Sequence, residues 1–297
     1  MLSILIPIYE VKIEQLVHNL KEQCRAADIE FEILCFDDCS SENVKKANRT
    51  VDSEIGVNYV ELSENQGRAK IRNRLAKSAQ YDYLLYLDAD SKVLSNDLIE
   101  NYSVHIAPET VVCGGRTYTD QRPKFDKKIL HWKYGTKRES RSAEFRSKHK
   151  MAYFHSNNFV IDRKVMFENP FEEEIRGYGY EDLTLAYQLD LRGVDIVHID
   201  NPIVHDRLED TEVFLNKSLQ ATENLFKLYK SGKIPYTRLI KAYKFLDAYY
   251  LKDSFLSFYS KWKDRIESNL KSKTPKMYYL DLYKLNHFVQ TAVKEFR

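Results

Sequence analysis

The 297-residue sequence contains few of the features that mark secreted, thiolate-metal or membrane-spanning proteins. Its four cysteines form neither a Cys-x-x-Cys pair nor a Cys/His array with zinc-ligand spacing, so we expect core or incidental thiols in a reducing cytoplasm. No segment approaches the roughly 20 consecutive apolar residues that cross a bilayer. Met1–Ser3 leads directly into an apolar strand, without a basic region or a cleavage site, so no signal peptide is expected.

The sequence also lacks an excess of charge of one sign. Its formal net charge is only +2, which gives no global signature of nucleic-acid binding, and we expect no nucleic-acid partner. Hydrophobic residues make up 43% and charged residues 30% of the chain, as in ordinary globular proteins, and the length is ample for a buried core. Local motifs must therefore carry the functional argument.

Strand-like and helix-like segments alternate through the first half of the chain. Short, continuous apolar runs predict strands at Leu2–Ile8, Phe31–Phe36, Val57–Leu62 and Tyr83–Leu87. Amphipathic segments between them predict helices near Ile13–Ala26, Glu42–Thr50 and Arg68–Ser78. Such alternation predicts an α/β fold with a Rossmann-like, mostly parallel sheet flanked by helices.

The second half is predicted to complete this sheet and then to change character. A helix is expected at Ser95–Ile106, with further strands at Val111–Tyr118 and Val194–Ile199. From Glu209 onward, apolar residues recur with helical periodicity. We therefore expect one domain over residues 1–206, with halves of about 1–118 and 119–206, and a helical C-terminal extension over 207–297.

The most informative stretch is the strand Tyr83–Leu87 and the two carboxylates that follow it, Asp88 and Asp90. In extended backbone, residues i and i+2 point to the same side, so the two side chains can converge on one divalent cation, which prefers oxygen ligands. Open α/β sheets bind their ligands at the carboxyl ends of strands. The alternative is a solvated turn after a buried strand, which fits these residues about equally well when they are taken alone.

Two neighbouring strands end in residues that suit a nucleotide. The first strand runs through Pro7 to Tyr9, and the second ends in Asp37 and Asp38. Carboxylates at this edge can accept hydrogen bonds from a nucleobase or a ribose, and Tyr9 can pack against a ring. The alternative is that the two acids close a turn while a following serine caps the next helix.

The segment from Asn65 to Asn73 places the turn residue Gly67 before a helix that is dense in cations. The start of such a helix can bind a pyrophosphate through backbone amides and charge. A solvated basic face is the alternative for any single arginine. For Arg72 a binding role is favoured over a solvated face, because Asn65, Gly67 and Asn73 accompany this arginine in one motif.

A glycine-rich turn precedes the last helix predicted in the sheet region. Gly177 and Gly179 flank Tyr178, and Glu181 and Asp182 open the helix. Glycines allow close approach of the backbone to a ligand. The acidic pair is either a helix cap or a general base that is held on rigid structure beside this turn.

A histidine ends the final sheet element expected, which follows the predicted strand Val194–Ile199. From that position His205 can complete a metal site begun by Asp88 and Asp90. His198 is the competing candidate, but its apolar neighbours predict burial within a strand. A lone histidine at the end of a strand is otherwise structural.

Together these segments resemble a family 2 glycosyltransferase of the GT-A fold, over roughly residues 1–206. The motifs stand in the family's order: the strand Leu2–Tyr9, Asp37-Asp38-x-Ser40-x-x-Asn43, Asn65-x-Gly67-(x)4-Arg72-Asn73, Asp88-x-Asp90 and Gly177-Tyr178-Gly179-Tyr180-Glu181-Asp182. Each motif is weak alone, and the five in order and spacing are specific. Cys39 and Asn43 replace the more usual Gly and Asp of the second motif, which leaves the geometry of the donor site open.

The resemblance implies an inverting enzyme that moves a sugar from a nucleotide-sugar donor, by the family pattern a UDP-sugar, to a hydroxyl of a glycan or lipid-linked acceptor in bacterial-type surface polysaccharide synthesis. In that family the second-strand acid binds uracil, and the residue matching Arg72 contacts base or phosphate. The Asp-x-Asp pair holds Mn²⁺ or Mg²⁺ on the diphosphate, and Asp182 matches the base. Residues 1–118 would bind the donor and residues 119–206 the acceptor.

The segment Lys124–Lys150 contains ten Lys and Arg residues against three acids, with Trp132 inside it. It falls between the metal-binding strand and the base, where an acceptor must enter, so Trp132 joins the glycine-rich turn on the acceptor side. One hypothesis is that this segment grips an anionic acceptor or, peripherally, the inner anionic face of a membrane. The other is a solvated, mobile loop.

The sequence opposes three rival functions. A sugar-1-phosphate nucleotidyltransferase would need a Gly-rich loop after the first strand, where the chain reads Pro7-Ile8-Tyr9-Glu10, and a nicotinamide dehydrogenase would need Gly-x-Gly-x-x-Gly. An inactive GT-A-like module that only binds sugar nucleotides is opposed by intact Asp88, Asp90 and Asp182. The sequence leaves open the sugar, the acceptor and linkage, the metal, the oligomeric state and the role of the C-terminal helices.

Overall fold

A computed structural model describes residues 1–175, 177–234 and 237–295. Contacts divide the chain into two compact units. The first unit comprises Met1–Thr119, Glu139–Glu174 and Glu181–Arg207, and the second comprises Asp120–Arg138, Ile175–Tyr180 and Leu208–Arg297. The first unit contains the sheets, and the second is helical.

The strands of the first unit are β1 (Leu2–Ile8), β2 (Phe31–Asp37), β3 (Val57–Glu61), β4 (Tyr83–Leu87), β5 (Ser91–Lys92), β6 (Thr110–Cys113), β7 (Arg116–Thr117), β8 (Asn158–Asp162), β9 (Asp195–His198) and β10 (Ile203–His205). Its helices are α1 (Glu14–Ala26), α2 (Glu42–Asn48), α3 (Arg68–Ser78), α4 (Leu98–Ser103), α6 (Ala143–Ser147), α7 (Arg163–Glu168) and α8 (Glu181–Leu191). The second unit contains α5 (Ile129–Tyr134), α9 (Thr211–Lys230), α10 (Arg238–Ala248), α11 (Lys252–Leu270) and α12 (Met277–Glu295).

The large sheet has seven strands in the order β3-β2-β1-β4-β8-β6-β9. The pairs of β1 with β2 and β4, of β2 with β3 and of β6 with β9 are parallel, whereas β8 runs antiparallel to β4 and β6. The predicted α/β class with a mostly parallel sheet is therefore confirmed. Since β1 to β4 are parallel, the loops after these strands share one edge of the sheet.

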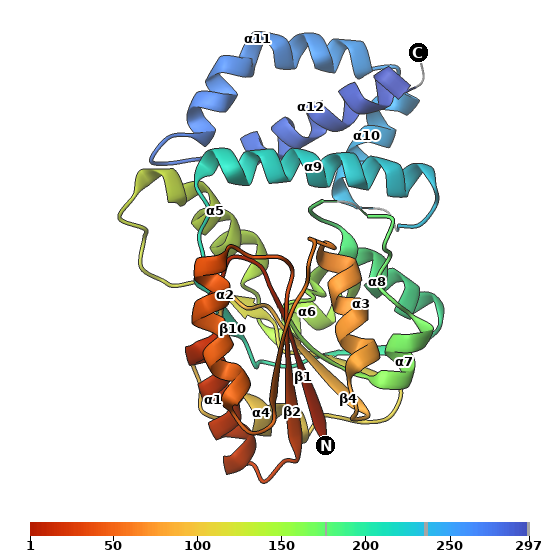
Figure 1. Cartoon of the computed structure of the whole chain (residues 1–297). Helices are drawn as coiled ribbons and strands as arrows, with labels where there is room; N and C mark the ends of the chain where they lie inside the picture. Colours follow the sequence, from red (N-terminus) through yellow and green to blue (C-terminus); the bar gives the residue numbers. More distant parts are fainter. Residues whose placement is uncertain (176, 235–236, 296–297) are drawn as a thin grey trace. The chain divides into compact units, whose positions relative to one another are not determined.

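Helices cover both faces of this sheet, which is why its central strands are continuous apolar runs. On one face, Ile4 and Ile6 pack with side chains of α1 and α4, and on the other Leu5 packs with α3, α7 and α8. Figure 1 shows α1 and α4 on one side of the strands and α3, α7 and α8 on the other.

A second, three-stranded sheet has the order β5-β10-β7, in which β10 pairs antiparallel with β5 and parallel with β7. The single strand predicted over Val111–Tyr118 is wrong, because Gly114 and Gly115 divide it into β6 and β7. A Cβ on Gly114 would lie 2.4 Å from the Asn201 carbonyl oxygen, and Gly115 has a φ of +90°. Only glycine fits this crossing, where the chain leaves the large sheet for the small one.

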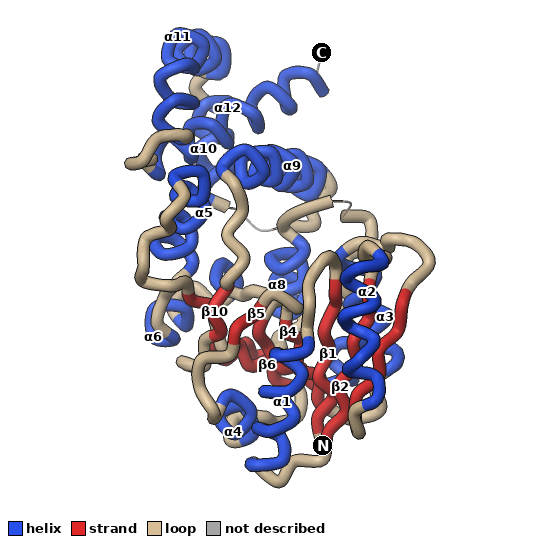
Figure 2. Tube along the Cα trace, turned by 60° about the vertical axis from the view of Figure 1, so that its left-hand side comes forward, coloured by secondary structure: helices blue, strands red, loops and turns tan. Residues whose placement is uncertain are grey.

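The helices of the second unit confirm the predicted helical C-terminus. The last helix, α12, packs against α9, α10 and α11. Figure 2 draws these helices in blue, and no red strand lies among them. One buried cluster of this unit contains Leu130, Phe214, Leu215, Tyr259, Ile266, Leu270 and Leu280, and further buried side chains such as Ile240, Phe288 and Val289 lie on α10 and α12.

The basic segment Lys124–Lys150 is not a loop throughout, since it forms α5, a π-helical turn over Gly135–Glu139, and α6. Within the first unit, Arg146 is almost fully buried, and its guanidinium donates hydrogen bonds to the carbonyl oxygens of Cys113, Gly114 and Ile199. Part of the positive charge of this segment is therefore used for folding.

Candidate functional site

The residues Asp88 and Asp90 lie just after β4, but in a turn and not in extended backbone. The Ser91 amide donates a 3.0 Å hydrogen bond to the Asp88 carbonyl oxygen, which closes this turn. The argument from strand alternation is therefore wrong as a reason for the convergence of the two carboxylates. Each carboxylate instead has its own neighbour from another element.

Asp88 is held by arginines from α3. Its Oδ1 accepts a 2.5 Å hydrogen bond from Arg72, whose side chain is only 2% exposed, and its Oδ2 lies 3.8 Å from an Arg68 nitrogen. Burial alone would raise the pKa of the Asp88 carboxyl, but the charges of Arg72 and Arg68 outweigh it and lower the pKa to about 2. Asp88 is thus a fixed carboxylate at neutral pH.

Asp90 lies beside His205, with 3.5 Å between its Oδ2 and the His205 Nδ1. The register of the small sheet produces this neighbourhood, because His205 pairs with Ser91, the residue after Asp90. The His205 ring also packs edge-on against Tyr118, at 5.5 Å between centroids. Tyr118 in turn donates a hydrogen bond to Glu139, which Arg116 contacts at 3.0 Å. The Tyr118 ring that packs against His205 is therefore itself held in place.

The side chains of Asp90 and His205 could supply some, but not all, of the ligands of a hard divalent cation. Among the described residues, no group of three or more His, Cys, Asp or Glu side chains is arranged to hold a metal by itself. Asp90 and His205 offer one carboxylate and one imidazole, while Asp88 is engaged by arginine. Mg²⁺-type sites commonly take one or two carboxylates and complete their shell with phosphates and water. The residues therefore fit a cation that a diphosphate helps to bind.

The Glu181-Asp182 pair at the start of α8 lies in the same region of the first unit. Arg68 joins the two sides, because its Nε donates a 2.6 Å hydrogen bond to the buried Glu181 carboxylate while its guanidinium approaches Asp88. Asp182 differs from Glu181, since its Oδ1 is buried without a hydrogen-bond partner among the described residues. A buried carboxylate oxygen of this kind is available to accept a proton.

The second-strand acids are both engaged by the protein. The Asp37 carboxylate accepts hydrogen bonds from the Ser40 amide at 2.7 Å and the Tyr59 hydroxyl at 2.9 Å. The Asp38 carboxylate accepts the amides of Gln66 and Gly67, at 2.6 and 3.0 Å. Asp37 thus closes the turn to Ser40, as the alternative interpretation expected, whereas Asp38 joins the loop after β2 to the two residues before α3. The serine cap of that interpretation is not made, because the Ser41 side chain at the N-cap of α2 forms no capping hydrogen bond.

Asn65 completes this arrangement, because its side-chain amide donates to the Asp38 carbonyl oxygen at 2.9 Å. Gly67 has a φ of +84° at the N-cap of α3. The adjoining Cys39 has a φ of +67°, a left-handed conformation that favours glycine. This explains physically why a glycine is the more usual residue at that position.

The loop after β1 is fixed against the loop after β2. Glu10 accepts hydrogen bonds from the Ser41 amide and hydroxyl, at 2.6 and 2.9 Å, and Arg207 donates to the Glu10 carbonyl oxygen at 2.8 Å. Pro7 is half-buried inside β1, whereas the Tyr9 side chain is exposed at its end. Tyr9 therefore presents a ring at the edge where the parallel strands end.

The acceptor-side candidates belong to the second unit. The carbonyl oxygen of Tyr178 accepts a hydrogen bond from Asn224 on α9, and a Cβ on Gly179 would lie 2.6 Å from Ala221 Cβ on the same helix. Gly177 also has a positive φ, of +80°. Trp132 is half-buried on α5. At Gly179, the close approach expected for a substrate is taken by α9.

Several polar residues of this region were not foreseen. The sequence pattern gives Arg68 no role beyond the basic face of its helix, and only its position directly after Gly67 at the sheet edge distinguishes it. The loop before β8 buries Ser156 Oγ, Asn157 Oδ1 and His155 Nε2 without hydrogen-bond partners among the described residues. The Asn157 carbonyl oxygen accepts the Asp88 amide at 3.2 Å, which places this loop against the Asp88 turn. No sequence signal indicated it.

Two histidines of the first unit, His198 and His155, have lowered pKa values. His198 is hydrogen-bonded to Arg146 at 2.8 Å, so its predicted burial is confirmed. Burial lowers the pKa of His198 and of His155 to about 4, and nearby arginine charge acts in the same direction. Both rings are therefore neutral at pH 7.

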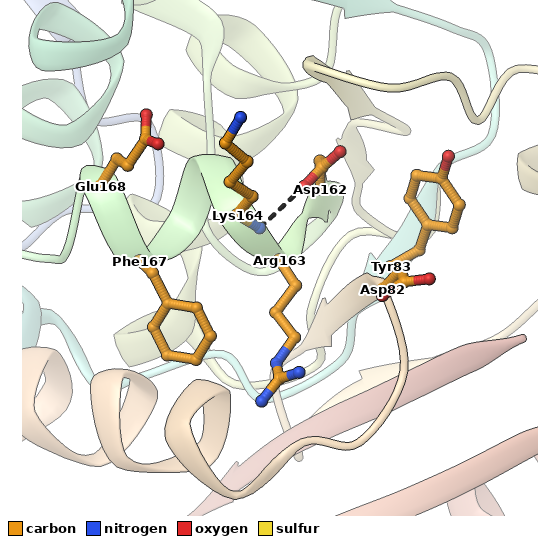
Figure 3. A pocket seen from close by; sticks show the side chains of 7 residues that line it. All are labelled: Asp82, Tyr83, Asp162, Arg163, Lys164, Phe167 and Glu168. Carbon is orange, nitrogen blue, oxygen red and sulfur yellow. Dashed lines mark hydrogen bonds between the residues drawn. The ribbon is translucent and has the colours of Figure 1, made fainter.

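A pocket of about 530 Å³ lies elsewhere in the first unit, lined by Asp82, Tyr83, Asp162, Arg163, Lys164, Phe167 and Glu168. Figure 3 shows Asp82 and Tyr83, where β4 begins, beside the residues of α7 that line the pocket. Since Asp88 follows the other end of β4, this pocket lies at the opposite edge of the sheet from the site.

Comparisons with known proteins bear on these motifs. The family model described as "Glycosyl transferase family 2" matches residues 3–167. An uncharacterized glycosyltransferase of Haemophilus influenzae is 31% identical over 134 residues, which cover 41% of this chain and 44% of that protein. The uncharacterized glycosyltransferase YfnE of Bacillus subtilis is 24% identical over 242 residues, which cover 65% of this chain and 61% of that protein. The chain thus spans less than two thirds of either relative.

Solved structures show the same fold at low identity. A Pyrobaculum calidifontis mannosyltransferase in complex with GDP-Man and Mn²⁺ gives a TM-score of 0.60 at 15% identity, covering 99% of this chain and 86% of that one. Residues 1–349 of Staphylococcus aureus TarS in complex with UDP-GlcNAc give 0.54 at 14% identity, covering 99% and 91%. These similarities confirm the predicted GT-A architecture.

Proposed function

The chain belongs to glycosyl transferase family 2, and from this premise we propose that it transfers a sugar from a nucleotide-sugar donor to an acceptor hydroxyl by an inverting displacement. The favoured donor is a UDP-sugar, and the favoured acceptor is a glycan or a lipid-linked glycan in the synthesis of a bacterial-type surface polysaccharide. A structurally similar protein was solved with UDP-GlcNAc and another with GDP-Man, which supports a nucleotide-sugar donor.

One observation carries this proposal. Arg68 links the Asp88 carboxylate to the Glu181 carboxylate, and the sheet register places Asp90 beside His205. Acids and a histidine that are more than 90 residues apart in sequence thereby meet at one edge of the sheet. Such an edge, where parallel strands end, is where open α/β folds bind ligands.

Asp182 is the base in this proposal. Its buried Oδ1, which has no hydrogen-bond partner among the described residues, accepts the proton of the acceptor hydroxyl while the acceptor oxygen bonds to the anomeric carbon. The bond between that carbon and the donor phosphate breaks on the opposite side, and its electron pair leaves with the nucleoside diphosphate. General-base assistance of this kind typically contributes about 10²–10⁴-fold to the rate. Glu181 positions the neighbouring Arg68 through their ion pair.

Asp90 and His205 are the residues that would hold Mn²⁺ or Mg²⁺, and Asp88 lies two residues before Asp90 in the same turn. When bound, such a cation supplies Lewis-acid stabilisation of the charge on a diphosphate leaving group. Tyr9 and the turns ordered by Asp37, Asp38 and Asn65 would receive the nucleoside. In this scheme, Arg72 acts by fixing Asp88, and Pro7 and Gly67 shape the loops around the donor.

The remaining assignments concern the acceptor and the compartment. Trp132 and the turn Gly177–Gly179 are proposed to contact the acceptor. Cys24, Cys35 and Cys113 are buried free thiols, which fits the reducing cytoplasm proposed as the compartment. There the enzyme would act at the inner face of a membrane, where lipid-linked acceptors are presented.

A direct test is the release of nucleoside diphosphate from a panel of UDP- and GDP-sugars with Mn²⁺ or Mg²⁺. We expect one donor to be turned over, with faster release on addition of acceptor and loss of release after exhaustive chelation. Donor binding without release at any acceptor would instead favour an inactive sugar-nucleotide binding module. Formation of pyrophosphate from a nucleoside triphosphate and a sugar 1-phosphate would favour a nucleotidyltransferase.

A further inference from the structure

Exposed aromatic side chains are concentrated on the C-terminal helices. Ten Phe, Tyr and Trp side chains are exposed among the described residues, and six of them fall between residues 245 and 278. These six are Phe245, Tyr249, Tyr250, Phe258, Trp262 and Tyr278. Their exposed fractions run from 41% for Trp262 to 92% for Tyr250. Exposed apolar side chains indicate a binding surface only where they lie together, as the Phe258 and Trp262 rings do.

The exposed aromatic residues of α11 form a stripe of their own. Phe258 and Trp262 are one helical turn apart, with ring centroids at 6.2 Å, and the half-buried Phe255 precedes them by three residues. The buried residues of α11 are Tyr259, Ile266 and Leu270, which pack in the core of the helical unit. The helix therefore carries one apolar stripe that is used for folding and a second that is left to solvent.

Cations surround the exposed stripe. The Arg265 guanidinium lies 5.0 Å from the Trp262 ring, and the Lys276 ammonium lies 5.8 Å from the Tyr278 ring. The Lys276 amide donates a 2.8 Å hydrogen bond to the Asn269 side chain near the end of α11, which holds Lys276 and the nearby Tyr278 beside this helix. We call the set Phe258, Lys261, Trp262, Arg265, Lys276 and Tyr278 the α11 face.

The charge of the chain is concentrated in the same segment. Residues 238–278 contain ten Lys and Arg against four Asp and Glu, a net charge of +6. The whole chain carries +2, so all other residues together carry −4. Among the described residues, Lys261, Arg265 and Lys276 of the α11 face are in no ion pair within 4.0 Å. Their charge is therefore available to an anionic partner.

From these observations we infer that the α11 face docks on an anionic lipid bilayer surface. Trp and Tyr side chains favour the boundary between headgroups and acyl chains, and Lys and Arg on the same face are attracted to anionic headgroups. No described helix is both long and apolar enough to cross a bilayer, so the contact is peripheral. This assigns a role to the C-terminal helices, beyond the proposed sugar transfer and independent of it.

The test is co-sedimentation of the full chain, without substrate, with vesicles of phosphatidylcholine alone or with an equal part of phosphatidylglycerol. We expect binding only to the anionic vesicles, with loss of binding as salt rises. The double variant Phe258→Ser, Trp262→Ser should bind at least about tenfold more weakly, because the exposed rings no longer enter the interface. The triple variant Lys261→Gln, Arg265→Gln, Lys276→Gln should bind about a hundredfold more weakly.

Two substitutions in the first unit serve as matched controls. Phe167 is 45% exposed, against 46% for Phe258, and Lys77 is an exposed lysine on α3, so Phe167→Ser and Lys77→Gln should bind like the wild type. Unchanged thermal unfolding of all variants shows that they are folded. Binding that ignores lipid charge, or that survives both α11-face variants, overturns the inference. So does light scattering that shows a dimer which the aromatic variant dissociates, since the face would then bind a second copy of the chain.

Discussion

Replacing Asp182 with asparagine tests the assignment of the base. The substitution keeps the shape of the side chain and removes its negative charge and its capacity to take a proton. Asp182 Oδ1 accepts no hydrogen bond among the described residues, so no contact that orders the start of α8 is broken there. We therefore expect a stability change within about 1 kcal/mol, because no buried partner is left unsatisfied.

The catalytic effect should be much larger. Loss of a general base lowers turnover by about 10²–10⁴-fold, which corresponds to roughly 3–5 kcal/mol in the activation free energy. Donor affinity should stay near the wild-type value, because the donor contacts proposed here lie on other elements. The split between turnover and binding distinguishes a lost base from a disturbed fold.

The assay measures nucleoside diphosphate release with saturating donor, beside donor binding by calorimetry. Asp190→Asn is the matched control, since Asp190 is an exposed carboxylate on the same helix. It should retain wild-type turnover. If Asp182→Asn turns over as fast as Asp190→Asn, Asp182 is not the base, whatever the fold.

Three further predictions concern stability. Arg72→Met leaves the largely buried Asp88 carboxylate without its 2.5 Å partner, so it should lower the free energy of unfolding by about 3 kcal/mol in urea denaturation. The control Arg74→Met, at an exposed arginine of the same helix, should change the free energy of unfolding little. An equal loss in both variants would contradict the buried ion pair. The pKa of Asp88 is lowered from 3.8 to about 2 in the folded protein, so the unfolded state binds more protons between these two pH values. About 2 kcal/mol of stability that is present above pH 5 should therefore be lost as the pH falls towards 2. Asp88→Asn should lack this part of the pH dependence, and an unchanged profile would refute it. Gly179→Ala should destabilise the protein by about 1–3 kcal/mol more than Gly232→Ala. Both glycines have a positive φ, but only a Cβ at position 179 would meet another side chain, Ala221, at 2.6 Å. Equal shifts of the unfolding temperature in the two variants would show that this contact does not matter.

The fold was predictable because its signals are local. The strands β1, β2 and β4 are short apolar runs, and α3 begins after Gly67 at Arg68 as its periodicity and turn residue indicate. Such patterns depend only on which faces are buried. The edge that collects the motifs follows from parallel pairing, which the alternation of strands and helices already implies.

The contacts within the site were not predictable in the same way, because they join distant elements. Nothing in the spacing of Asp88 and Asp90 shows that a turn separates them or that Arg72 holds the first. The position of His205 beside Asp90 depends on the pairing of β10 with β5, a strand of only two residues. The need for glycine at position 179 arises from Ala221, 42 positions away in the chain.

The most direct test of the shared site is a double-mutant cycle on Mn²⁺ affinity in the presence of the nucleoside diphosphate, with Asp90→Asn and His205→Asn. If both side chains bind one ion, each single variant should lose at least about tenfold in affinity, the smallest effect usual even for an outer partner of a ligand. The double variant should then lose less than the product of the two, because the second loss acts on a site already opened by the first. Independent, multiplicative effects, or wild-type affinity in either single variant, would contradict the claim that Asp90 and His205 belong to one metal-binding site.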